Sequence, residues 1–135
     1  MKILHSADWH LDSPLTGKSE EQSKFLRAEL LKVPDRVAAL CKSENCDLLL
    51  LAIYPEGSAS WLERHAHLVK TNTLVIDCCG IKDEICRRCF PLAKHYGFTF
   101  VGGHPMAGSH HSGFKYSRSN LFQGAPMVLV PPVFD

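Results

Sequence analysis

The feature that most constrains the fold of this chain is the alternation of short apolar runs with segments of helical periodicity. Five runs have the length and composition of strands, and we predict strands at residues 2–6, 47–53, 73–77, 98–101 and 127–130. The second run is apolar almost throughout, which is typical of a strand buried in a parallel sheet. This alternation predicts an α/β fold: a mostly parallel sheet with helices on both faces, as in a partial Rossmann-like domain.

Helical patterns fill the spaces between these runs, and we predict helices within residues 19–41, 58–70 and 81–96. Ser19 and Gln22 have the spacing of a capping box at the start of the first helix. Pro34 predicts either a kink or a break into a second helix, and Gly97 predicts the end of the last helix. Ligands of such sheets collect at the carboxyl ends of the strands, so candidate site residues lie at 8–10, 54–57, 77–82 and 102–108.

Composition argues against several classes of protein. Fifteen Lys and Arg stand against fourteen Asp and Glu, which gives no broad basic surface for a nucleic-acid partner. The longest apolar run, from Leu48 to Tyr54, is seven residues and too short to cross a bilayer. Asp8 also stands where a signal peptide would be apolar. We therefore expect a soluble, cytoplasmic protein without a membrane partner, whose six cysteines are reduced.

Asp8 and His10 follow the first predicted strand and are separated by one residue. A carboxylate and an imidazole at this spacing can both reach one divalent cation such as Mn or Zn. The alternative is structural, a surface aspartate beside a half-buried histidine. With the apolar Asp-Leu-Leu-Leu-Leu-Ala segment that ends at Ala52, residues 1–52 resemble the start of bacterial metallophosphoesterases of the DNA-repair exonuclease branch. The resemblance implies that Asp8 and His10 are ligands of the first of two metal ions.

The remaining ligands of that family have no counterpart in this sequence. The family's next strand ends in Gly-Asp, whereas Ala52 is followed by Ile53 and Tyr54, and the later histidine motifs are missing. Hydrolysis of a phosphodiester by two metals requires both cations to be held close together. We therefore expect a metal binder at most, without nuclease activity.

A second resemblance begins near residue 50 and continues to about residue 132. The segments LLAIYPEG, LVIDCCGIKDEI, FVGGHPMAG and SGFKYSRSNLFQGAPMVLVPP are together similar to the nucleotide-binding domain of prephenate dehydrogenases. That family oxidises and decarboxylates prephenate with NAD in tyrosine biosynthesis. We therefore divide the chain into a metallophosphoesterase-like piece, residues 1–52, and a prephenate dehydrogenase-like piece, residues 53–135, joined as a chimera that folds as one unit.

The second resemblance assigns roles to four residues. His104, in the HPMAG motif, corresponds to the family's catalytic histidine, since a group that titrates near neutrality can take the substrate's hydroxyl proton. Gly80 stands where the family usually carries a substrate-binding serine, and Lys82 matches a family lysine. Pro55 lies where the family's loop approaches NAD. The structural alternatives are a loop histidine bonded to backbone and a solvated lysine.

Parts of the family's site are missing from this sequence. None of the nine glycines forms the G-x-G-x-x-G cradle for the pyrophosphate, and the chain stops at Asp135, before the family's helical dimerisation domain. We expect weak NAD binding, very low turnover of prephenate, and a homodimer or aggregation through exposed apolar surface. Three hypotheses follow: a prephenate dehydrogenase-like fragment, a metallophosphoesterase-like metal binder, or an inactive or engineered chimeric scaffold. For the activity of the chain itself, the third ranks highest.

Overall fold

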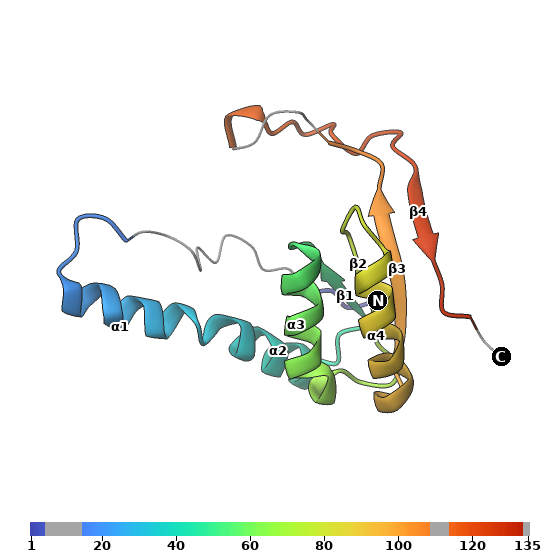
Figure 1. Ribbon diagram of the computed structural model, residues 1–135, viewed down its shortest axis with the longest axis horizontal. Coiled ribbons are helices and arrows are strands. Elements are labelled where there is room, and N and C mark those ends of the chain that lie inside the picture. Colours follow the sequence, from blue (N-terminus) through green and yellow to red (C-terminus); the bar gives the residue numbers. More distant parts are fainter. Residues whose placement is uncertain (5–14, 109–113, 134–135) are drawn as a thin grey trace.

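The computed structural model describes residues 1–4, 15–108 and 114–133, and a four-stranded sheet is at its centre (Figure 1). The strands are β1 (Leu48–Leu51), β2 (Leu74–Asp77), β3 (Thr99–Pro105) and β4 (Met127–Val130). They lie in the order β1-β2-β3-β4, with β1, β2 and β3 parallel and β4 antiparallel to β3. The predicted α/β fold with a mostly parallel sheet is therefore confirmed.

Two helices connect the parallel strands, α3 (Pro55–His65) and α4 (Asp83–Tyr96). Connections between parallel strands are right-handed, so two successive connections in one direction place both helices on the same face. Figure 1 shows α3 and α4 side by side along the strands. In the described residues α4 packs directly on β3, and α3 packs on α4 in the same layer.

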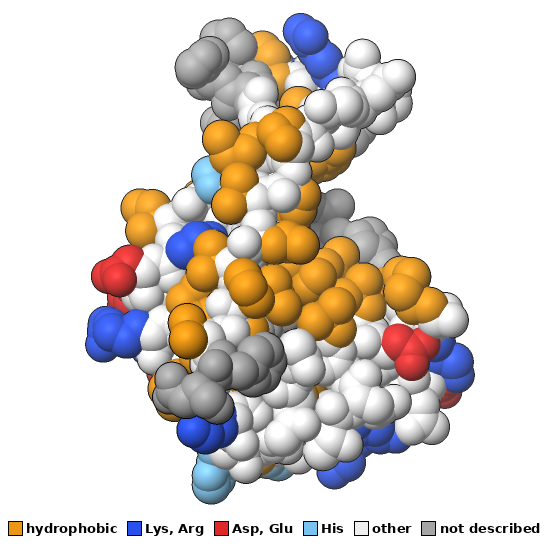
Figure 2. All heavy atoms as spheres, turned by 90° about the vertical axis from the view of Figure 1, so that its right-hand side faces the viewer, with side chains coloured by type: hydrophobic (Ala, Val, Ile, Leu, Met, Phe, Trp, Pro, Cys, Tyr) orange, Lys and Arg blue, Asp and Glu red, His pale blue; other side chains and the backbone are white. Residues whose placement is uncertain are grey.

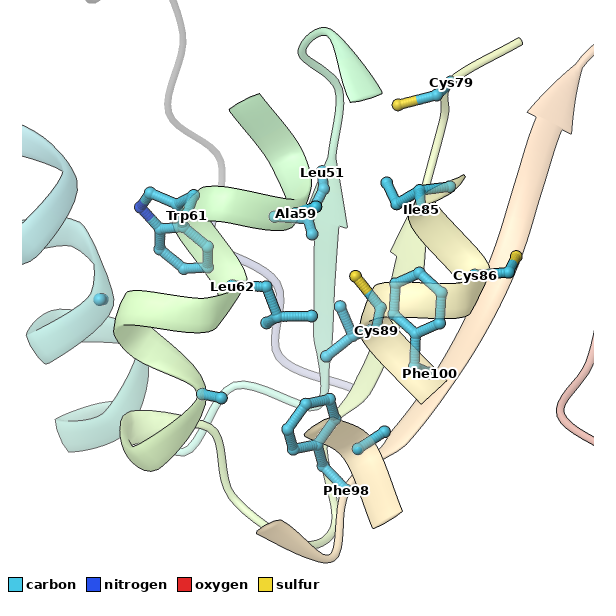
Figure 3. Packing of buried hydrophobic residues seen from close by; sticks show 14 residues of the cluster. Leu51, Ala59, Trp61, Leu62, Cys79, Ile85, Cys86, Cys89, Phe98 and Phe100 are labelled. Atoms are coloured by element: carbon cyan, nitrogen blue, oxygen red, sulfur yellow. The ribbon is translucent and has the colours of Figure 1, made fainter. Parts of the chain in front are cut away.

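The hydrophobic core lies between the sheet and these two helices (Figure 3). Val75 and Phe100 point into it from β2 and β3 and are fully buried. Leu62 of α3 and Ile85 of α4 meet them and are also fully buried. Burial of each such side chain contributes roughly 1.5–3 kcal/mol to folding. This packing holds the strand ends, where the candidate residues lie, in one rigid layer.

The opposite face of the sheet is also apolar but remains partly exposed. Leu50, Ile76 and Val101 are aligned across β1, β2 and β3, and Leu129 pairs with Gly103 on β4. Leu50 is 50% exposed and Leu129 is 54% exposed. Figure 2, which looks at the right-hand side of Figure 1, shows hydrophobic side chains gathered in a broad band. We call Leu50, Ile76, Val101 and Leu129 the uncovered face.

Two helices precede the sheet, α1 (Glu20–Leu30) and α2 (Val33–Ser43). The predicted capping box is present, since Ser19 Oγ accepts from the Gln22 amide and Gln22 Oε1 accepts from the Ser19 amide. Pro34 lies in the first turn of α2, so the predicted interruption is a break into two helices. Figure 1 shows α1 extending away from the sheet, and none of its residues is buried. α2 is attached to α3 through a 2.6 Å contact between Asp35 and His65.

The boundaries of the remaining elements differ modestly from the predicted ones. Ile3 forms a single parallel bridge with Leu48, which is the described part of the strand predicted at residues 2–6. The second predicted helix begins earlier, at Pro55, because proline is favoured in a first helical turn, and it is followed by η1 (Ala66–Leu68). A short turn, η2 (Phe114–Tyr116), precedes β4. Within the described ranges, no helix is both long and apolar enough for a membrane span.

Candidate active site at the strand ends

A cavity of about 680 Å³ opens at the carboxyl ends of β1 and β2. Three segments form its walls: residues 52–55 after β1, residues 78–80 after β2, and residues at the end of β3 between 104 and 107. Phe122 also lines the cavity. Three of the four regions selected from the sequence therefore meet in one place. The fourth, residues 8–10, lies outside the described residues.

His104 is held in this wall by the hydrogen-bonded ladder of β3 and β4. It pairs with Val128, and just beyond it the Met106 amide donates to the carbonyl of Pro126 at 2.9 Å. Its partly buried ring faces the segment after β2, because a Cβ atom added to Gly80 would lie 3.6 Å from His104 Cε1 and 3.9 Å from Nε2. The structure thus brings together His104 and Gly80, two residues selected from the sequence.

Lys82 does not line the cavity, although the sequence suggested a role in substrate binding. Its Nζ donates to Asp77 Oδ2 and, at 2.6 Å, to the carbonyl oxygen of Gly103. Only 16% of the Lys82 side chain is exposed. The ammonium group is therefore directed into the protein, beneath the cavity wall.

Asp77 lies in one of the regions selected from the sequence but was assigned no role there, and it is the centre of the polar contacts below the cavity. Its side chain is completely buried. Besides Lys82, its Oδ2 accepts from the Cys79 amide at 2.9 Å, and its Oδ1 accepts from the Gly103 amide at 3.1 Å. A carboxylate that ends an apolar strand, with a lysine five residues later, was the available signal in the sequence.

Pro55 lines the cavity at the first turn of α3, and Tyr54 precedes it in extended conformation as the N-cap residue. The amino-terminal end of α3 is therefore directed at the cavity. The predicted contact between Pro55 and a dinucleotide stays a prediction.

The two cysteines in the cavity wall are poor nucleophiles. Burial raises the pKa of both Cys78 and Cys79 above the usual value for a thiol. The Cys79 thiol also donates to the carbonyl of Ile53 at 3.1 Å, which links the segments after β1 and β2. Protonated thiols do not attack substrates, so neither cysteine is suited to nucleophilic catalysis.

The predicted metal ligands Asp8 and His10 belong to the residues that the structure does not describe. Within residues 1–4, 15–108 and 114–133, no group of three or more His, Cys, Asp or Glu side chains is arranged to hold a metal ion. The geometry therefore gives no support to a metal centre.

Comparison with known proteins decides the family. The model of the prephenate dehydrogenase nucleotide-binding domain matches residues 6–133. The chain belongs to the prephenate dehydrogenase family. Prephenate dehydrogenase of Bacillus subtilis is 53% identical over 84 residues, which are 62% of this chain and 22% of that protein. The Lactococcus lactis enzyme is 28% identical over 121 residues, 89% of this chain and 34% of that protein.

A solved structure gives the same assignment for the fold. Prephenate dehydrogenase from Aquifex aeolicus, in complex with hydroxyphenyl propionate and NAD⁺, superposes with a TM-score of 0.56 at 26% identity, over 70% of this chain and 32% of that chain. This chain spans at most about a third of the length of the curated relatives it matches. It therefore corresponds to part of a family enzyme, the nucleotide-binding domain.

These comparisons do not support the predicted metallophosphoesterase-like start. The family match begins at residue 6 and crosses the predicted junction near Ala52 without interruption. The apolar strand and the Asp-x-His pair that suggested the other family are short features, and short apolar strands are common to many parallel sheets. The matches support a relationship to prephenate dehydrogenases across most of the chain and give no support to a chimera.

Proposed function

We propose that this chain provides the nicotinamide and substrate side of a prephenate dehydrogenase site, with His104 as the residue that takes the substrate's hydroxyl proton. The observation that carries the proposal is the position of His104 beside Gly80, in the wall of a cavity at the carboxyl ends of parallel strands. Prephenate and NAD are the proposed ligands. The oxidised dinucleotide supplies a hydride acceptor when it is bound.

The residues present fit the ring end of such a cofactor. Gly80 carries no side chain, and a Cβ there would already contact the His104 ring, so the backbone after β2 leaves space for a flat ring to approach. Pro55 and Ile53, which follow the neighbouring strand β1, provide an apolar wall across the cavity. Mostly apolar walls with a few polar groups favour a small organic ligand.

The phosphate end of the cofactor has no cradle of the usual kind. The sequence contains no G-x-G-x-x-G, so the close backbone approach that normally binds a pyrophosphate is missing. We therefore propose weak binding of NAD, with a Kd on the order of 1 mM. Turnover of prephenate is expected to be very low, because ring binding alone leaves the substrate poorly aligned.

The proposal is tested by titrating the ¹⁵N-labelled chain with NAD⁺ and then with prephenate. NAD⁺ should shift the amide signals of Cys79, Gly80 and Ala107 in a saturable manner. His104→Asn should reduce the response to prephenate and leave the NAD⁺ response in place, whereas His67→Asn, at an exposed position on η1, should change neither. Shifts confined to residues far from the cavity would refute the proposal.

Activity provides a second measurement. The purified chain with NAD⁺ and prephenate should form NADH at a rate that is very low compared with a full-length family enzyme. Rapid NADH formation by the 135-residue chain would show that the missing cradle is unnecessary and would overturn this account of the site.

A further inference from the structure

We infer that Asp77 and Lys82 are positioning residues, which set the distance between the Gly80 wall and the His104 wall of the cavity. The inference rests on the proposed function of that cavity. It assigns Lys82 a task different from direct contact with substrate, the role suggested by the sequence.

The first observation is the set of contacts around the peptide that precedes His104. The Gly103 amide donates to Asp77 Oδ1 at 3.1 Å, and the Gly103 carbonyl accepts from Lys82 Nζ at 2.6 Å. Because Lys82 also donates to Asp77, the three residues form a closed ring of hydrogen bonds. Both polar groups of one residue are thus held by side chains from the neighbouring strand end and helix start. The ring of His104 begins one residue later.

The second observation concerns the other wall. Asp77 Oδ2 also accepts from the Cys79 amide at 2.9 Å, directly before Gly80. One carboxylate therefore joins the residue before His104 to the residue before Gly80. A change in its position would move both walls.

The third observation is that β3 is shaped to accept this arrangement. A Cβ at Gly102 would lie 3.2 Å from Lys82 Cδ and 2.6 Å from Cys86 Sγ. A Cβ at Gly103 would lie 2.4 Å from the backbone oxygen of Asp77, closer than real Cβ atoms approach. The absence of a side chain at Gly102 thus leaves room for the aliphatic part of Lys82 on one face of β3. Its absence at Gly103 leaves room for the end of β2 on the other face.

Asp77 and Lys82 carry opposite charges, so the effect of changing one depends on whether the other is still charged. Asp77 is completely buried, and an isolated buried carboxylate is strongly unfavourable. Removal of the lysine charge alone would leave that carboxylate unpaired, so part of any single-variant effect would be a loss of stability. Neutralising both partners removes this penalty but also removes the donor to the Gly103 carbonyl.

The test uses four proteins: the unchanged chain, Asp77→Asn, Lys82→Met and the double variant. Stability is measured by urea unfolding, the cavity by the NMR signals of the His104 ring, and binding by titration with NAD⁺. Lys94→Met, at an exposed position of the same helix, is the matched control and should behave like the unchanged chain.

We expect Lys82→Met to lose the most stability and the double variant to regain most of it. The His104 signals of the double variant should nevertheless remain displaced, and its NAD⁺ affinity should stay about tenfold below that of the unchanged chain, because the walls are no longer held in place. Recovery of the ring signals and of affinity together with stability would show a merely structural role and overturn the inference.

The two proposals can fail separately. If the unchanged chain does not bind NAD⁺ at the cavity, the proposed function fails, and the positioning role is then judged by the His104 signals alone. If single variants do not fold, the double variant still decides the question, since it contains no unpaired buried charge.

Discussion

The two faces of the central sheet have similar sequences and different environments. Val75 and Phe100 on one face are fully buried under α3 and α4, whereas Leu50 and Leu129 on the other are about half exposed. Neighbouring residues of one strand point to opposite faces, so both faces receive large apolar side chains from the same short runs. An apolar strand indicates that its side chains favour burial, but it does not indicate which face of the sheet is buried. The path of the connecting helices decides that.

The difference also explains where the cavity lies. The covered face has helices that begin at the carboxyl ends of the strands. Pro55, in the first turn of α3, lines the cavity, and Lys82, the N-cap residue of α4, lies beneath its wall. The four described residues of the uncovered face all have aliphatic side chains. An exposed apolar face of this kind favours self-association or contact with another protein.

The largest expected effect is on the covered face. Phe100→Ala should lower the free energy of unfolding by about 3–5 kcal/mol, because it removes a fully buried ring and leaves a cavity. Leu50→Ala, on the uncovered face, should cost less than about 1 kcal/mol because half of its side chain is already in water. Urea unfolding of both variants measures the contrast, and equal losses would mean that the uncovered face is buried in solution.

The next effect concerns self-association. We propose that two copies of the chain form a homodimer through their uncovered faces. The chain should show a concentration-dependent shift toward dimer in sedimentation equilibrium. Leu129→Lys should weaken that association at least about tenfold, because a charge would have to be buried between two apolar surfaces. Phe25→Lys, at a 65% exposed position on α1, is the control. A strictly monomeric chain at high concentration would refute this proposal.

A smaller effect is expected where α4 turns back into the sheet. Gly97 ends the helix with φ of 78°, and a Cβ there would lie 3.2 Å from Thr71 Cγ2. Gly97→Ala should therefore reduce stability by about 1 kcal/mol. Gly97→Asn should lose less, since asparagine tolerates the left-handed conformation better. Thermal unfolding distinguishes the two variants, and an order reversed from this one would contradict the explanation.

The smallest effect lies on the outer side of the covering helices. Arg88 of α4 binds Glu63 and Glu56 of α3 at 2.7 Å and 2.6 Å. The hydrogen bond from Arg88 lowers the pKa of Glu63, and hydrogen bonds from Ser60 and then Arg88 lower that of Glu56. Because the folded-state pKa values are lowered, this stabilisation is present above the ordinary value of 4.5 and is lost as pH falls through the folded values.

Thermal unfolding as a function of pH tests this linkage. Arg88→Gln should lower the Tm slightly at pH 7, and the difference from the unchanged chain should shrink below about pH 4.5. The effect is small because both carboxylates are solvent-exposed and the pairs are screened. Arg87→Gln, on the exposed side of the same helix, serves as the control. A difference that grows on acidification would have the wrong sign.

Much of the architecture and part of the site could be predicted from the sequence. The apolar runs predicted the four strands of the sheet, and the HPMAG motif identified His104, which lies in the cavity wall beside Gly80. The burial of Asp77 was not predicted, because a carboxylate at a strand end resembles a solvated residue until its partners are known. Lys82 comes from a different element and Gly103 from a different strand, so only the packed structure brings them together.

The sequence by itself determined the kinds of element, their order and the residues with useful chemistry, because periodicity, capping and glycine placement act over a few neighbouring residues. The tertiary structure decided which face of the sheet is buried and which charged groups lie inside. It also decided whether a lysine contacts ligand or supports the wall behind it. Those outcomes depend on distances between residues far apart in the chain, and on a buried charge being tolerated only where a partner from another element reaches it.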